Sequence, residues 1–179
     1  PLRRQRQMCI RDSFIFVLMI SSTSSASEYR PKNFEEIIGQ DAIVKTLNNA
    51  IDKDNIPQAL LFCGPRGVGK TSCARILAKT INNIDEDFEY NIFELDAASN
   101  NSVEDIRNIT DQIRVPPQKG RYKVYIIDEV HMLSNQAFNA FLKSLEEPPE
   151  HVVFILATTE KNKICLLYTS PSPRETSLH

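Results

Sequence analysis

The sequence predicts an α/β fold in which a mostly parallel sheet is covered by helices on both faces. Short apolar runs of the strand type alternate with helical patterns between residues 28 and 164. One run leads directly into a glycine-rich segment, and a later run ends in the acidic pair Asp128 and Glu129. With 179 residues, of which 41% are hydrophobic and 25% charged, the chain has the material for one globular domain with one core.

The first half of this pattern contains two helices and two strands. Residues 41–51 form an amphipathic helical pattern, and residues 59–63 form an apolar strand. A helix follows over about 69–81, and a second strand over 92–95. The apolar stripe of the first helix consists of Ile43, Val44, Leu47, Ala50 and Ile51.

Helix capping signals and prolines delimit the elements of the second half. Ser102 and Asp105 form a capping pair that opens a helix, which ends before the prolines at 116–117. Ser134 opens another helix after the strand at 123–127, and the prolines at 148–149 stop it. The last strand expected is 152–157.

The segment GPRGVGKT, residues 64–71, fills every fixed position of the phosphate-binding pattern GxxxxGK[ST]. Its glycines allow backbone N–H groups to curl around phosphates at the start of a helix. Lys70 is expected to reach the β and γ phosphates, and the Thr71 hydroxyl to bind Mg²⁺. A chance glycine-rich turn is the alternative, but the strand before it and the helix after it favour a P-loop NTPase core. The expected nucleotide-binding residues of this segment are Gly64, Pro65, Arg66, Gly67, Val68, Gly69, Lys70, Thr71 and Ser72.

The acidic pair decides what happens to the nucleotide. Asp128, at the end of a strand, is expected to position Mg²⁺ through its water shell, and Glu129 to orient or deprotonate the attacking water. Many strands end in acidic loop residues, so this pattern alone is weak. Downstream of a phosphate-binding loop it indicates nucleotide hydrolysis.

The two ends of the chain are expected to lie outside the domain. Residues 1–28 join basic, apolar and small residues in an order that resembles a short secretory signal. We interpret them instead as an unstructured leader, adapter-derived or untranslated, with Met19 as a candidate start. Residues 165–179 are interpreted as a non-native, adapter-like tail, which leaves 29–164 as the domain.

The formal net charge of -2 carries no general nucleic-acid signature. The basic residues Lys119, Arg121 and Lys123 form a short run, for which solvated loop charge is the simpler explanation. The four cysteines show no CxxC spacing, which predicts reduced thiols in a cytoplasmic protein.

Several blocks of the chain resemble the gamma/tau family of bacterial DNA polymerase III, which are AAA+ clamp-loader ATPases. The blocks DEVHMLS and SLEEPP are the most specific, and the resemblance covers about residues 29–164. The blocks, in order, are YRPKNFEEIIGQ, GPRGVGKTSCARILAK, FELDAASNNSVEDIR, YKVYIIDEVHMLS, FNAFLKSLEEPPEH and FILATTEK.

The resemblance adds further site residues. It implies that Thr158 or Thr159 is the sensor 1 hydroxyl, on a strand between the two nucleotide-binding strands, although ordinary strand filling would also explain these threonines. Glu129, Lys70, Thr158 and Thr159 are then the candidate catalytic residues, with Thr71 and Asp128 as metal ligands. The adenine pocket would be lined by Arg30, Pro31, Ile37 and Ile38.

The resemblance also implies ATP and Mg²⁺ as cofactors and a hetero-oligomeric ring as the working state. Its expected partners are other clamp-loader subunits, the sliding clamp, the DNA polymerase core and primed DNA, with no membrane. Residues 82–90 lack the cysteines of the family's zinc module, so we expect no zinc.

The same comparison predicts a domain truncated before the lid, because the arginine-finger motif, a fifth strand and the lid are not found after residue 163. That strand would flank the phosphate-loop strand, so an unpaired sheet edge is expected there. A catalytically silent, nucleotide-binding clamp-loader scaffold or a related AAA+ replication or repair ATPase is an alternative function, and a kinase is a weaker one.

Overall fold

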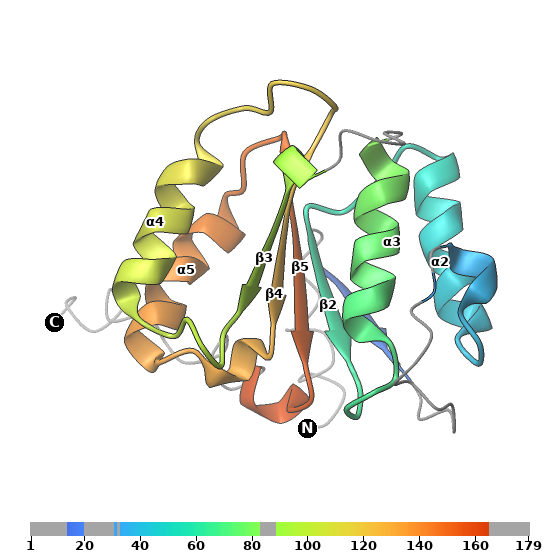
Figure 1. The fold of residues 1–179 in the computed structure, drawn as a ribbon, viewed down its shortest axis with the longest axis horizontal. Helices are drawn as coiled ribbons and strands as arrows, with labels where there is room; N and C mark the ends of the chain where they lie inside the picture. The colour runs from blue at the N-terminus through green and yellow to red at the C-terminus, as the bar shows by residue number, and fades with distance from the viewer. Residues whose placement is uncertain (1–13, 20–30, 32, 83–88, 165–179) are drawn as a thin grey trace, which may run out of the picture.

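The computed structural model describes residues 14–19, 31, 33–82 and 89–164 (Figure 1). The order of elements is that of a P-loop α/β domain, with helices and strands alternating after the first strand. The strands are β1 (Phe14–Leu18), β2 (Ala59–Cys63), β3 (Ile92–Asp96), β4 (Lys123–Asp128) and β5 (Val152–Thr158). The helices are α2 (Asp41–Asp52), α3 (Lys70–Asn82), α4 (Val103–Ile113) and α5 (Asn135–Glu146), with single 3₁₀ turns at η1 (Phe34–Glu36), η2 (Glu89–Asn91) and η3 (Val130–Met132).

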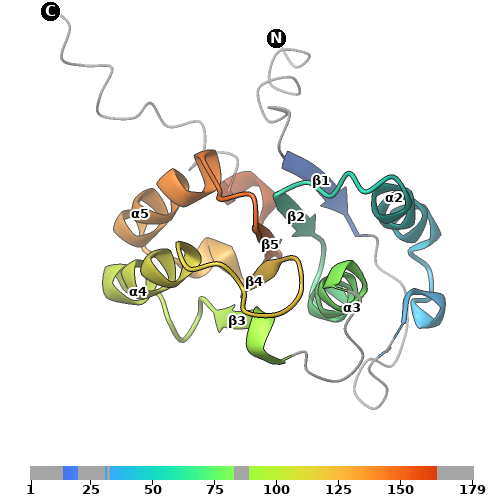
Figure 2. The same cartoon turned by 90° about the horizontal axis from the view of Figure 1, so that it is seen from above.

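All five strands are parallel and lie in the order β1-β2-β5-β4-β3. Helices α2 and α3 cover one face of the sheet and α4 and α5 the other (Figure 2). Because β5 lies between β2 and β4, the three strand ends that carry the expected site residues are neighbours. The expectation that the sensor strand lies between the two nucleotide-binding strands is confirmed.

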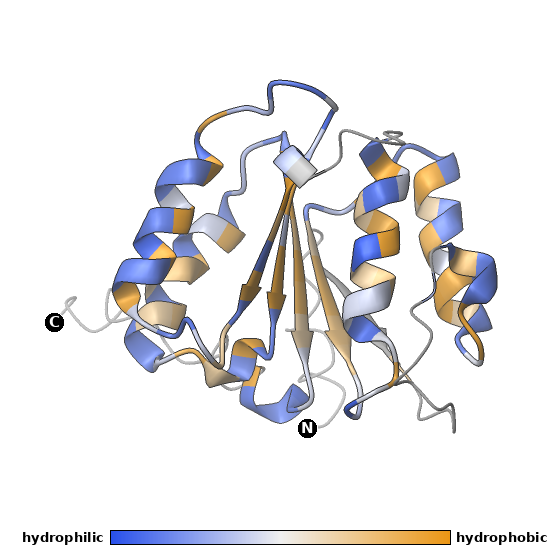
Figure 3. Ribbon diagram, in the orientation of Figure 1, coloured by the Kyte–Doolittle hydropathy of each residue, from blue (hydrophilic) through white to orange (hydrophobic). Residues whose placement is uncertain are grey.

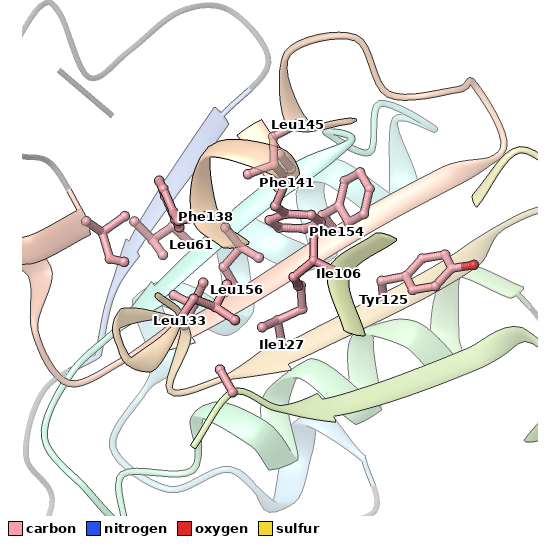
Figure 4. Close-up of a cluster of buried hydrophobic side chains, with 14 of the residues drawn as sticks. Leu61, Ile106, Tyr125, Ile127, Leu133, Phe138, Phe141, Leu145, Phe154 and Leu156 are labelled. Carbon is pink, nitrogen blue, oxygen red and sulfur yellow. The ribbon is translucent and has the colours of Figure 1, made fainter. Parts of the chain in front are cut away.

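Side chains alternate between the two faces of the sheet along each strand, so the protein has one hydrophobic core on each face. On β2, Leu60 and Phe62 pack with α2 and α3, whereas Leu61 and Cys63 pack with α4 and α5. Strands buried on both faces read as continuous apolar runs, which is why they are the most apolar elements in Figure 3. Figure 4 shows the α4–α5 side, where Phe141 and Phe154 meet edge to face with ring centroids 5.2 Å apart.

The capping predictions are confirmed. Ser102 accepts a hydrogen bond from the N–H of Asp105, whose carboxylate accepts one from the Ser102 N–H, and α4 begins there. The Ser134 hydroxyl caps α5 by accepting a hydrogen bond from the N–H of Ala137. The predicted bounds of β2 are confirmed, and those of the other elements differ by two residues or fewer.

Two expectations are wrong: that residues 1–28 are unstructured, and that one edge of β2 is unpaired. Residues 14–18 form strand β1, although the segment 1–28 was expected to be unstructured. Strand β1 pairs in parallel with β2 from Phe14↔Ala59 to Leu18↔Cys63, so the edge of β2 that was expected to be unpaired is covered. An unpaired strand edge is costly, and a short apolar run of the right length satisfies it.

Within the described part of the chain, no helix is long and apolar enough to cross a membrane.

Candidate functional site

The loop between β2 and α3 has the left-handed glycines that are typical of phosphate-binding loops. Gly67 and Gly69 have φ angles of 81° and 89°, which other residues rarely adopt. The N–H of Cys73 bonds to the Gly69 carbonyl at 2.8 Å, so α3 starts within the motif and leaves its first N–H groups unpaired within the helix. The N–H of Gly64 bonds to the Thr158 carbonyl at 3.2 Å, which ties the loop to the end of β5.

Lys70 is buried beneath this loop, with 6% of its surface exposed. Its Nζ donates to the carbonyls of Gly64 at 3.0 Å and Pro65 at 2.9 Å. Burial lowers the pKa of Lys70, and the nearby carboxylates of Glu129 and Asp128 act in the opposite direction. The ammonium group is therefore held at the loop while facing both acids.

Thr71, the next residue, is joined to the end of β4. Its hydroxyl donates to Asp128 Oδ2 at 2.6 Å, and the other carboxylate oxygen of Asp128 accepts the N–H of Glu129 at 2.9 Å. A hydroxyl and a carboxylate are the hard oxygen ligands that Mg²⁺ prefers. The donor set brought together here fits a magnesium ion beside the phosphate loop.

Glu129 has a left-handed backbone, with φ 47° and ψ 44°. This conformation is uncommon for a residue other than glycine and is typical of functional sites. It ends β4 abruptly and starts the turn η3, so the Glu129 side chain stays at the sheet edge beside the loop. Glu129 Oε2 accepts a hydrogen bond from the Thr159 hydroxyl at 3.3 Å.

The structure separates the two threonines that the sequence left equivalent. Thr158 is completely buried, and its hydroxyl accepts the N–H of Glu160 at 3.0 Å. Thr159 is exposed and reaches Glu129. Neighbouring residues at the end of a strand point to opposite sides, so only one of them can face the acid.

Sequence reasoning missed His131, which was read only as one letter of the DEVHMLS block. Its Nδ1 lies 2.9 Å from Thr158 Oγ1 and 3.4 Å from Glu129 Oε2. A histidine two residues after a left-handed position gives no local sequence signal. Its contacts follow from the turn at Glu129 and the order of the strands.

The residues expected around adenine are less closely grouped. Ile37 is half-buried and packs against the core on the α2–α3 side, Pro31 is half-buried, and Ile38 is 75% exposed. Arg30 lies outside the described residues. In the loop itself Arg66 is exposed, Ser72 is half-buried and Val68 is buried.

The described residues contain no group of three or more His, Cys, Asp or Glu side chains that could hold a metal ion. Part of the segment expected to lack the zinc module, 83–88, lies outside these residues. Cys63 and Cys73 are buried cysteines that form no disulfide, as expected for reduced thiols, and burial raises the pKa of Cys73 to about 12. Cys9 and Cys165 also lie outside the described residues.

The short basic run is used within the protein. Lys123 donates to the Gln112 carbonyl at 3.2 Å, and Arg121 forms an ion pair with Asp54. The expectation of solvated loop charge is therefore wrong for Lys123, which is buried at the start of β4, whereas Arg121 is exposed.

Comparison with known proteins gives consistent relatives. Residues 86–172 match the family model described as DNA polymerase III, delta subunit. The chain is 50% identical to the tau subunit of DNA polymerase III from Bacillus subtilis over 163 residues, which is 82% of this chain and 29% of that protein. It is 47% identical to the gamma subunit from Buchnera aphidicola subsp. Schizaphis graminum over 156 residues, 78% of this chain and 43% of that protein.

Solved structures show the same fold. A DNA polymerase III gamma subunit-related protein from Thermotoga maritima superposes with a TM-score of 0.57 at 25% identity, covering 73% of this chain and 46% of that one. The RuvB Holliday junction branch migration motor from the same organism gives a TM-score of 0.56 at 25% identity, covering 76% and 45%. Both likenesses agree with a P-loop core of the AAA+ type.

The chain thus spans less than half the length of the curated relatives it matches, yet it is similar to them over about four fifths of its own. The region matched by the family model, residues 86–172, includes the acidic strand end and the two threonines. By sequence and by fold, the chain is thus similar to DNA polymerase III gamma and tau subunits over most of its own length.

Proposed function

We propose that this chain binds ATP with Mg²⁺ in the loop 64–71 and hydrolyses it as a subunit of the DNA polymerase III clamp loader. One observation carries the proposal: the 2.6 Å bond from Thr71 to Asp128 joins the phosphate loop to an acidic strand end. This bond brings a metal-binding pair, a buried lysine and the carboxylate of Glu129 to one edge of the sheet.

The loop and Lys70 hold the phosphates in this proposal. Backbone N–H groups at the start of α3 point toward the anion, and the helix dipole favours negative charge there. Lys70 exchanges its bonds to the Gly64 and Pro65 carbonyls for the β and γ phosphate oxygens. These carbonyls keep the ammonium in place before the nucleotide enters.

Thr71 would bind Mg²⁺ directly, and Asp128 through the water shell of the ion. When bound, Mg²⁺ neutralises the negative charge that develops on the transferred phosphoryl group. Glu129 accepts a hydrogen bond from the attacking water and orients it. Thr159, because its hydroxyl reaches Glu129, is the better candidate for sensor 1, and Thr158 supports it from the buried side.

The wider role is supported by the relatives, whose names place them in DNA polymerase III. In that role the chain works in the cytoplasm in a ring with other clamp-loader subunits, and ATP drives loading of the sliding clamp onto primed DNA beside the polymerase core. An arginine from a neighbouring subunit stabilises the negative charge of the transition state. Such an arginine raises the hydrolysis rate by about 10³ to 10⁵ in well-studied hydrolases. The isolated chain is therefore expected to hydrolyse ATP slowly.

The test is Glu129→Gln in the complete protein assembled with its partner subunits, clamp and primed DNA. We expect ATP affinity within about twofold of the unchanged protein and phosphate release lower by about 100-fold or more, the range of a general base. Glu104→Gln on the exposed side of α4 is the control and should change neither value. Phosphate release that survives Glu129→Gln contradicts the role of Glu129.

ATP binding by the unchanged assembly without any phosphate release would identify a nucleotide-binding scaffold instead. No uptake of ATP in the presence of Mg²⁺ would overturn the whole proposal.

A further inference from the structure

His131 is a buried polar side chain between two strand ends, and the mechanism above does not use it. Only 7% of its side chain is exposed. One ring nitrogen, Nδ1, lies 2.9 Å from Thr158 Oγ1 and 3.4 Å from Glu129 Oε2. A single atom of His131 therefore faces both the last residue of β5 and the carboxylate proposed to orient the attacking water.

The backbone explains how the side chain reaches this place. The left-handed conformation of Glu129 turns the chain at the end of β4, and the N–H of Met132 closes the turn on the Glu129 carbonyl at 2.8 Å. The turn returns His131 toward β5. Val130, the residue directly before His131, is completely buried and holds the start of the turn against the core.

The neighbours of Nδ1 decide which ring nitrogen carries the proton. A carboxylate only accepts hydrogen bonds, so a lone pair on Nδ1 would repel Glu129 Oε2, whereas a hydrogen there attracts it. Thr158 Oγ1 already accepts the N–H of Glu160 at 3.0 Å and has a second lone pair for the Nδ1 hydrogen. The other nitrogen, Nε2, lies 3.9 Å from Glu160 Oε1, which is beyond hydrogen-bond distance. We assign the proton to Nδ1 on these contacts.

We propose that His131 is a positioning residue for ATP hydrolysis: its Nδ1–H, directed at Thr158 at the buried end of β5, lies 3.4 Å from Glu129 Oε2 and holds that carboxylate by electrostatic attraction. The inference rests on the proposed function and adds a residue to it. His131 and the Thr159 hydroxyl both contact Oε2 of Glu129. The second oxygen, Oε1, is then left to accept the hydrogen of the attacking water. Small errors in such an orientation are costly, up to about 100-fold for about 1 Å.

A purely structural role would be to fill space between η3 and β5. Two substitutions separate the roles, because the amide of asparagine occupies the place of Nδ1, whereas that of glutamine occupies the place of Nε2. His131→Asn keeps a hydrogen-bond donor toward Glu129 and Thr158. His131→Gln keeps more of the side-chain volume and moves the donor away.

The experiment measures kcat, ATP affinity and thermal unfolding for His131→Ala, His131→Gln and His131→Asn in the complete assembly. We expect kcat to fall by about 10- to 100-fold for the alanine and glutamine variants and by less than about fivefold for asparagine. ATP affinity should stay within about twofold in all three, since His131 does not contact the phosphate loop. His151→Ala is the control: this half-buried histidine bonds to the Ile113 carbonyl away from the site, and its loss should leave kcat unchanged.

Three results would overturn the proposal: unchanged kcat in His131→Ala, equal kcat in the asparagine and glutamine variants, or losses of kcat that simply follow the losses of thermal stability. The proposed function is tested separately by the unchanged assembly and by Glu129→Gln. If these two behave as expected while His131→Ala turns over normally, only the role of His131 fails. If the unchanged assembly releases no phosphate, the proposed function fails first.

A second readout does not depend on turnover. The ¹⁵N and ¹H resonances of the His131 ring should show the neutral tautomer protonated on Nδ1. Observation of the tautomer protonated on Nε2 alone would contradict the assigned contact to Glu129.

Discussion

The hydroxyl of Thr71 donates a 2.6 Å hydrogen bond to Asp128, although 57 positions separate the two residues. The bond joins the first turn of α3 to the end of β4, two elements that meet because parallel strands end at the same edge of the sheet. Strand β5 lies between their parent strands, β2 and β4, and contributes Thr158 and Thr159 to the same edge. The site is therefore built from three strand ends and one helix start.

Replacing Thr71 tests the metal-binding pair. Thr71→Ala removes the hydroxyl and leaves Asp128 Oδ2 without its donor, and a hydrogen bond to a charged group contributes about 1.5–3 kcal/mol. We expect affinity for ATP to fall by about 10- to 100-fold in Mg²⁺ and to change little in a chelator, measured by calorimetry. Thr71→Ser keeps the hydroxyl and should bind like the unchanged protein. An equal loss with and without Mg²⁺ would show that Thr71 acts on the nucleotide alone.

Lys70 should be needed for binding but not for folding. Its charge is buried, and burial lowers its pKa, so the folded protein gains little from the ammonium itself. Lys70→Met keeps the length of the side chain without the charge. We expect ATP affinity to fall by at least about 100-fold, while the free energy of unfolding changes by less than about 1 kcal/mol.

Lys79→Met, on the exposed side of the same helix, is the matched control for Lys70→Met. It should bind ATP normally. A Lys70→Met protein that unfolds at a much lower denaturant concentration would mean that the bonds of Nζ to the loop carbonyls stabilise the fold itself.

Replacing either of two loop glycines, Gly64 or Gly67, should lower the stability of the protein, but for different physical reasons. A Cβ at Gly64 would lie 2.6 Å from the Met19 carbonyl oxygen, so Gly64→Ala forces the backbone to move, at a cost of about 1–3 kcal/mol. At Gly67 a Cβ meets nothing within 4 Å, and the cost comes from the φ of 81°, about 1–2 kcal/mol.

Asparagine separates the two cases, because it tolerates a positive φ better than alanine but is larger. Gly67→Asn should recover part of the stability lost in Gly67→Ala, and Gly64→Asn should be no better than Gly64→Ala. Urea unfolding measures both pairs. Recovery at Gly64 would contradict the close approach of Met19.

Much of this architecture could be predicted because local signals and burial agree. Strand β2 has its predicted bounds because its five apolar residues are buried on both faces, and α4 begins at Ser102 because the capping pair is local. Strand β1 could not be predicted in the same way. The apolar run at 14–18 follows basic residues, as in a leader, and only its pairing with β2 makes it a strand.

The candidate site likewise contains residues that could be predicted from the sequence and residues that could not. The motifs at Gly64–Thr71 and Asp128–Glu129 predicted residues that the structure brings together, because those patterns encode a loop and a strand end. The sequence could not distinguish Thr158 from Thr159, since the direction of each side chain depends on where β5 ends. It gave no sign of His131, whose contacts require the left-handed turn at Glu129.

Replacing Tyr125 with phenylalanine should stabilise the folded protein. Its ring stacks on Phe93 with centroids 4.9 Å apart, but its buried hydroxyl has no hydrogen-bond partner among the described residues, and burial raises its pKa to about 12. A buried polar group without a partner costs about 1–3 kcal/mol. Tyr125→Phe removes that cost and keeps the ring contacts, so we expect a free energy of unfolding higher by about 1 kcal/mol, seen as a higher urea midpoint with an unchanged slope. Tyr122→Phe is the control: Tyr122 directly precedes β4 and packs in the core on the α2–α3 side, so its replacement should change the midpoint less. A lower midpoint for Tyr125→Phe would mean that the hydroxyl is hydrogen-bonded in solution, and the packing at this end of the α4–α5 core would then include a bound water.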